Sequence, residues 1–186
     1  ISTAGVAFQQ LTNIPPLLLA SWRMQATALL LAVGAVREWR VASDDLRARW
    51  FKTWPRLGVS GVCLGAHFGA WVAGLQTTTL ARSLLLVCTT PLFIAFGALA
   101  LCLPTSTGEL AGAALGFVGV AMVASDQHDG ERERATWQGD TLSLGAAFYI
   151  VGYMLVGADV RRWMPLCMYA GPVTAVAAVC TGVVSY

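Results

Sequence analysis

The chain has 186 residues, of which 56% are hydrophobic and only 12% are charged. Soluble domains usually carry about 25% charged residues, so these figures exclude an ordinary water-soluble domain and indicate a lipid bilayer as the solvent. The formal net charge of +2 gives no reason to expect a nucleic-acid partner, because the basic residues are concentrated in one segment. The five cysteines lie inside apolar runs and lack metal-ligand spacing, so we interpret them as small apolar side chains.

The apolar runs predict a series of membrane-spanning helices, each of which needs about 20 mostly apolar residues. Residues 1–13 are expected to be the tail of a first span, so we interpret the chain as a fragment whose first helix is truncated. Further spans are expected at 17–36, 57–76, 83–103, 107–124, 139–158 and 164–186. This pattern predicts an all-α, polytopic helical membrane protein.

Charge is distributed unevenly over the segments that join these spans. The longest connection, 37–56, and the short loop 159–163 together hold eight of the twelve lysines and arginines. Cytoplasmic loops of membrane proteins carry an excess of these residues. The pattern therefore predicts a multi-pass protein in which 37–56 and 159–163 are cytoplasmic and the acidic loop 125–140 is extracellular or lumenal.

The span at 57–76 carries a row of small residues and a row of polar and aromatic ones. On a helix, Gly61, Gly65 and Gly69 form a ridge that allows close approach to a neighbouring helix, and a similar glycine ridge lies on the span 107–124. His67 and Trp71 fall on the side opposite the first ridge. A histidine is costly against lipid. Two interpretations follow: His67 lines a cavity with Trp71, or a neutral imidazole donates a hydrogen bond to another helix.

Three stretches carry a resemblance to a known family. AHFGAWVAGLQTTTLARSLLLVCTTPLFIAF (66–96) resembles the EamA-like branch of the drug/metabolite transporter superfamily, which has a His-Phe…Trp…Leu run in its third helix and a Thr-Pro-Leu-Phe element in its fourth. PPLLLASWRMQATALLL (15–31) and GELAGAALGFVGVAMVAS (108–125) are similar to its second and fifth helices. The family usually has a glutamate shortly after the fourth helix, where this chain reads CLPTSTGEL, and Glu109 comes later than that position.

The resemblance implies a ten-helix fold of two five-helix repeats with inverted topology. Residues 1–125 would be the first repeat, with helix 1 truncated and helices 2–5 complete. Residues 126–186 would start the second repeat with helices 6 and 7, the latter truncated, so that helices 8–10 are missing. The resemblance also implies a secondary transporter that moves small organic metabolites by alternating access, and it favours the cavity interpretation of His67. A small-molecule solute and the lipid bilayer are then the expected partners. Whether the protein also forms a homodimer is left undecided by the sequence.

Other polar residues within the spans are candidates for binding the solute. Arg23 lies about six residues inside the second helix, where an arginine either snorkels outward or binds an anionic group at the mouth of a cavity. Tyr149 and Tyr153 are four residues apart and share one face of the sixth helix. They line the cavity or pack as ordinary aromatic side chains.

The fourth helix contains Thr89 and Thr90 directly before Pro91. Proline removes one backbone donor and frees a carbonyl group, which a threonine hydroxyl can satisfy. The motif therefore predicts either a static kink or a hinge of the transport cycle. We include both threonines among the candidate substrate-binding residues.

Other functional classes have weaker support in the sequence. It has no P-loop, no HExxH and no G-x-S-x-G motif, so we predict no catalytic residue, no metal site and no cofactor. Within the superfamily, a nucleotide-sugar or sugar-phosphate exchanger is the second candidate, and such relatives usually carry Lys or Arg deep in late helices. A membrane enzyme or a non-transporting membrane scaffold protein is the alternative of another class.

Overall fold

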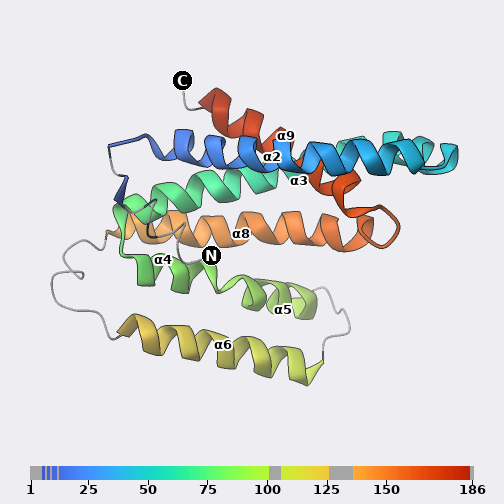
Figure 1. Ribbon diagram of the computed structural model, residues 1–186. Coiled ribbons are helices and arrows are strands. Elements are labelled where there is room, and N and C mark those ends of the chain that lie inside the picture. The colour runs from blue at the N-terminus through green and yellow to red at the C-terminus, as the bar shows by residue number, and fades with distance from the viewer. Residues whose placement is uncertain are drawn as a thin grey trace. The chain divides into compact units, whose positions relative to one another are not determined.

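Helices that are long enough to cross a membrane dominate the structure, a computed structural model (Figure 1). It describes residues 6, 8, 10, 11, 13–100, 106–125 and 136–184. Five stretches are long and apolar enough to span a bilayer: Pro16–Val41, Asp44–Thr77, Leu80–Leu99, Trp137–Val160 and Leu166–Val183. These stretches confirm the prediction of an all-α, polytopic membrane protein.

The charged segment 37–56 is helical and is not the loop that its charge predicts. The helices α2 (Pro16–Val41) and α3 (Asp44–Thr77) run through it and leave only Ser43 and the residue before it outside a helix. The hydroxyl of Ser43 accepts a hydrogen bond from a backbone amide of α3 at 3.3 Å and caps its start. With 34 residues, α3 is about 51 Å long, whereas the apolar core of a bilayer is about 30 Å thick. The charged residues therefore extend both helices beyond the apolar parts of their spans.

The fourth span is broken. The helices α4 (Leu80–Val87) and α5 (Thr90–Ala100) occupy the place of the single helix expected at 83–103, of which residues 101–103 lie outside the described part of the chain. Pro91 falls in the first turn of α5, where its missing amide hydrogen costs little because that turn has no intrahelical acceptor. The proline therefore belongs to the start of a new helix and does not simply bend an existing one.

The remaining helices lie close to the expected spans. They are α6 (Thr107–Ser125), α8 (Trp137–Val160) and α9 (Leu166–Val184). Most of the loop expected at 125–140 lies outside the described residues. The chain divides into two compact units that interleave in sequence. The first unit comprises Ile1–Asn13 and Ala70–Val151, and the second unit comprises Ile14–Gly69 and Gly152–Tyr186.

In the second unit, the glycine ridge of α3 packs closely on α9. A Cβ atom added at Gly61 would lie 2.6 Å from the Val176 Cβ atom and 2.9 Å from the Val173 carbonyl oxygen. At Gly65 it would lie 3.2 Å from the Ala177 carbonyl oxygen. These spacings are at or below ordinary contact, so only glycine allows the two backbones to approach this closely. The predicted ridge is thereby confirmed, with α9 as the neighbour of Gly61 and Gly65 and with Leu17 of α2 as the neighbour of Gly69.

In the first unit, small residues also bring helices together. A Cβ atom added at Gly74 of α3 would lie 2.5 Å from the Ser143 hydroxyl oxygen of α8 and 3.1 Å from the Gly139 carbonyl oxygen. The Ser143 hydroxyl in turn donates a hydrogen bond of 2.9 Å to the Ser83 hydroxyl of α4. Both serines are fully buried. Van der Waals contact and one hydrogen bond thus join the ends of three helices without any long side chain.

The α3–α9 contact predicts opposite effects for two alanine substitutions on the same helix. We expect Gly61→Ala to destabilise the protein by about 1–3 kcal/mol, because the new methyl group overlaps the α9 backbone. At Gly58 an added Cβ atom meets nothing within 4 Å, so Gly58→Ala should be neutral or stabilising by up to about 1 kcal/mol through helix propensity. Denaturant titration of the purified full-length protein in detergent measures both, and equal effects would contradict the close contact.

Candidate functional site

His67 and Trp71 are both buried, as the polar row on α3 predicts. Their exposed fractions are 8% and 5%, and they lie one helical turn apart on α3. The His67 ring meets the Phe68 ring edge-on, with the ring centroids 4.9 Å apart. His67 belongs to the second unit and Trp71 to the first. An imidazole buried at the centre of an apolar span can donate through one ring nitrogen and accept through the other.

Arg23 of α2 packs against α3 in the second unit. Its guanidinium carbon lies 4.6 Å from the centroid of the Phe68 ring, which is a cation–π distance. The neighbour of Gly69 is Leu17 of α2, so Phe68 lies level with the first turn of α2. The Arg23 side chain therefore runs toward the N-terminal end of its helix, in the direction that snorkelling requires. This contact brings a guanidinium to the residue next to His67.

Tyr153 packs beside a tyrosine that the sequence does not single out. In the second unit, the Tyr153 ring lies 6.1 Å from the ring of Tyr169 on α9. The Tyr169 hydroxyl makes a hydrogen bond of 2.7 Å with the Ser60 hydroxyl of α3, and it also reaches the Tyr153 carbonyl oxygen at 3.4 Å. Ser60 lies on the same polar row of α3 as His67. At that end the row is therefore bound to α9 by a buried hydrogen bond.

The two threonines and Tyr149 occupy different environments in the first unit. The Thr89 hydroxyl donates to the Leu86 carbonyl oxygen at 2.6 Å, and the Thr90 hydroxyl donates to the Val87 carbonyl oxygen at 2.7 Å. Both hydroxyls thus satisfy carbonyl groups at the end of α4, as the local sequence suggests. Tyr149 is 43% exposed, unlike the buried Thr90.

A polar cluster that the sequence analysis misses surrounds Asp140, in the first turn of α8. Its carboxylate accepts a hydrogen bond from the Thr78 hydroxyl at 2.8 Å and another from the Arg82 Nε atom at 3.2 Å, and it also contacts Arg82 Nη2. The Asp140 side chain is 13% exposed and that of Arg82 is 47% exposed. Arg82 is therefore half of an ion pair between α4 and α8. In the sequence, this cluster was indicated by an aspartate at the water-facing end of an apolar span.

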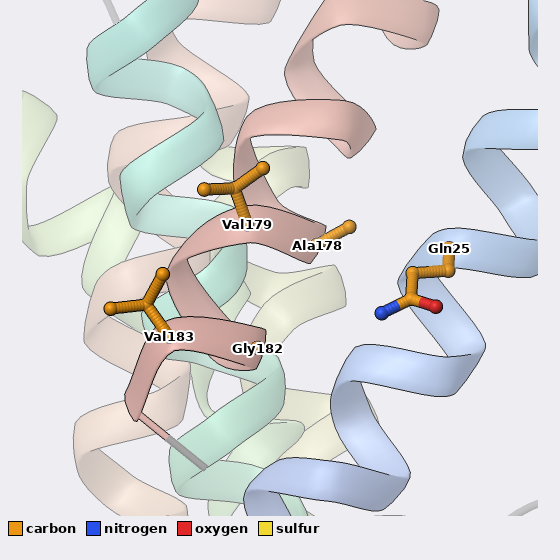
Figure 2. A pocket seen from close by; sticks show the side chains of 5 residues that line it. All are labelled: Gln25, Ala178, Val179, Gly182 and Val183. Carbon is orange, nitrogen blue, oxygen red and sulfur yellow. The ribbon is translucent and has the colours of Figure 1, made fainter. Parts of the chain in front are cut away.

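A shallow hollow of about 300 Å³ lies between α2 and α9 in the second unit (Figure 2). Its lining is almost entirely apolar and comprises Gln25, Ala178, Val179, Gly182 and Val183. The Gln25 amide donates to the Ser21 hydroxyl at 2.9 Å, and that hydroxyl donates to the Ala178 carbonyl oxygen at 3.3 Å. None of the seven residues that the sequence marks as candidates lines this hollow.

Two aspartates of α8 allow a matched test of the Asp140 cluster. Asp159 pairs with Arg56 at 2.9 Å, but both side chains are largely exposed, 64% and 67% respectively. We expect Asp159→Ala to cost less than about 1 kcal/mol, because water screens an exposed pair. Asp140→Ala should cost about 1.5–3 kcal/mol, because it leaves Thr78 and Arg82 without their shared acceptor. Thermal unfolding of both variants checks the order, and a larger loss for Asp159→Ala would refute it.

Comparison with known proteins agrees with this architecture of apolar helices. A model of the EamA-like transporter family matches residues 1–125, which is more than half of the chain. No curated protein and no solved structure gives a significant match. The matched region contains α2 to α6 and with them the His67–Trp71 turn and the Thr89–Thr90 break. The chain is thus a multi-pass membrane protein that belongs to the EamA-like transporter family, within the drug/metabolite transporter superfamily.

Proposed function

We propose that this transporter moves small organic metabolites, such as amino acids or drug-like solutes, by alternating access, and that His67 contacts the solute. The observation that carries the proposal is the burial of His67, 8% exposed, at the middle of the apolar part of α3. Ionisable residues at such a depth are expensive and are usually retained for function. The guanidinium of Arg23, packed on the adjacent Phe68, supplies a positive charge near the same turn.

We propose five further residues for the solute site. They are Trp71, Thr89, Thr90, Tyr149 and Tyr153. For the threonines, the hydrogen bonds to α4 carbonyl oxygens support a structural role at the helix break. Coupling to a proton or to counter-exchange of a second solute fits His67, because imidazole titrates near neutral pH.

A nucleotide-sugar or sugar-phosphate exchanger is less well supported. Phosphate recognition favours several arginine or lysine side chains that converge on one site. Two arginines lie near the apolar parts of the described spans. Arg82 is already paired with Asp140, and Arg23 packs on the Phe68 ring. These two arginines do not form the cluster of positive charge that a phosphate group needs. A solute with at most one anionic group therefore agrees better with the structure than a sugar phosphate does.

We also propose that the α2–α3 connection faces the cytoplasm and that the loop around Gly130 faces the opposite side. Ser43 is exposed between the two helices, and six of the twelve basic residues of the chain lie within 37–56. Single cysteines at Ser43 and Gly130, in a background without native cysteines, should react with an impermeant thiol reagent from opposite sides of the membrane. Reaction of both from the same side would refute this topology.

The His67 proposal predicts that two substitutions in the full-length protein have different effects, one on solute transport itself and the other on its pH dependence. His67→Ala should abolish solute flux or change its selectivity while membrane insertion is retained, because the imidazole contacts the solute. His67→Gln keeps a donor and an acceptor but does not titrate. It should therefore retain solute binding and lose the part of the pH dependence that comes from this residue. Flux into reconstituted vesicles, normalised to folded protein, measures both variants.

The alternative role of His67 gives a different result in the same experiment. If the imidazole only bonds a neighbouring helix, His67→Ala lowers thermal stability and yield, while flux per folded molecule stays at the parent level. Unchanged normalised flux would falsify solute contact by His67. Turnover of a lipid or peptide without solute flux would instead support a membrane enzyme.

A further inference from the structure

A patch of basic side chains lies beside the start of α3 in the second unit, and we propose that it binds the phosphate group of an anionic phospholipid of the surrounding bilayer. The patch consists of Arg49 and Lys52 on α3 and of Arg161 and Arg162 in the turn between α8 and α9. All four residues are exposed. The inference does not depend on the transported solute or on the proposed role of His67.

Two contacts bring the parts of this patch together. The guanidinium carbon of Arg49 lies 4.0 Å from the centroid of the Trp163 ring. Two helical turns further along α3, the Arg56 guanidinium pairs with the Asp159 carboxylate at 2.9 Å. Segments more than a hundred residues apart in the sequence are thus neighbours, with Arg161 and Arg162 in the turn between Asp159 and Trp163.

The positive charge of the patch is poorly compensated. Asp159 is already paired with Arg56, and Asp44 is paired with Arg47 at 3.1 Å. Glu38 accepts a hydrogen bond of 2.7 Å from the backbone amide of Met168. Among the described residues, the side chains of Lys52 and Arg162 have no ion pair and no hydrogen bond. Asp45, one turn before Arg49 on α3, makes no ion pair within the described residues, so the four cations outnumber the nearby acids and an external anion would offset the excess.

The position of Arg49 and Lys52 along α3 favours a lipid as the source of this anion. The residues precede the apolar part of α3 at 57–76, so they stand at the level of the headgroups. Phe51 (63% exposed) and Trp54 (45% exposed) lie at the same depth on the other side of α3, where they pack with Trp39 and Trp50. Aromatic residues are enriched at this depth, where the ring meets the acyl chains. The aromatic side chains mark the depth of the headgroups, and at that depth the bilayer itself presents phosphate groups to the cations.

The test is the lipid selectivity of the full-length protein in bilayers. Brominated phosphatidylglycerol and brominated phosphatidylcholine each quench tryptophan fluorescence, and Trp163, whose ring contacts Arg49, reports from the patch when the other six tryptophans are replaced by phenylalanine. We expect the parent protein to bind phosphatidylglycerol more tightly, and added salt to reduce this preference. Lys52→Gln with Arg162→Gln should lower the relative binding constant by about fivefold for each cation removed. Both side chains lack partners among the described residues, so folding should be retained.

Removal of the same charge elsewhere provides the matched control. Arg132→Gln with Arg134→Gln changes the net charge equally, and this pair should leave the lipid preference unaltered. The proposal is overturned if the parent shows no preference, or if both double variants lose it to the same extent. It is also overturned if soluble glycerol 1-phosphate displaces brominated phosphatidylglycerol, because the site would then recognise a free phosphate ester.

Discussion

The close approach of α3 and α9 at Gly61 and Gly65 is the constraint on which the second unit depends. In a bilayer, lipid tails are as apolar as leucine, so helices associate through packing and interhelical hydrogen bonds and not through the hydrophobic effect. Because the ridge leaves no room for a Cβ atom beside the Val173 carbonyl oxygen, the rotation of α3 about its axis is fixed. That rotation turns Ser60 to its hydrogen bond with Tyr169 and determines how His67 is buried.

Periodicity in the sequence predicted the spans and the α3 ridge, but it did not predict whether a ridge has a partner. The glycines of α6 have the same spacing, yet Cβ atoms added at Gly112 and Gly116 would meet nothing within 4 Å in the part of the chain described. Charge was also a poor guide to helix ends. The segment 37–56 is rich in arginine, which favours helices, and its only interruption is at the Ser43 cap.

The burial of three candidate residues was predicted, whereas the partners of the candidate residues were not. His67, Trp71 and Thr90 are buried, as polar residues inside an apolar span should be when they avoid lipid. Tyr169 and Asp140 were missed because their contacts join residues far apart in the sequence, which no local pattern encodes. Arg82 shows the consequence, because only the position of α8 reveals its ion pair with Asp140.

Contacts along α8 show where this protein can place charge. Its two aspartates lie at its two ends, Asp140 in the first unit and Asp159 in the second, and each is paired with an arginine. Between them, Gly152 comes within 3.0 Å of the Cys63 sulfur of α3, measured from an added Cβ atom. Water or headgroups offset the cost of charge at helix ends, whereas α8 carries no charged side chain between its two aspartates. An ionisable residue at that depth is an exception to this distribution, and the exception at His67 is the reason to seek the function there.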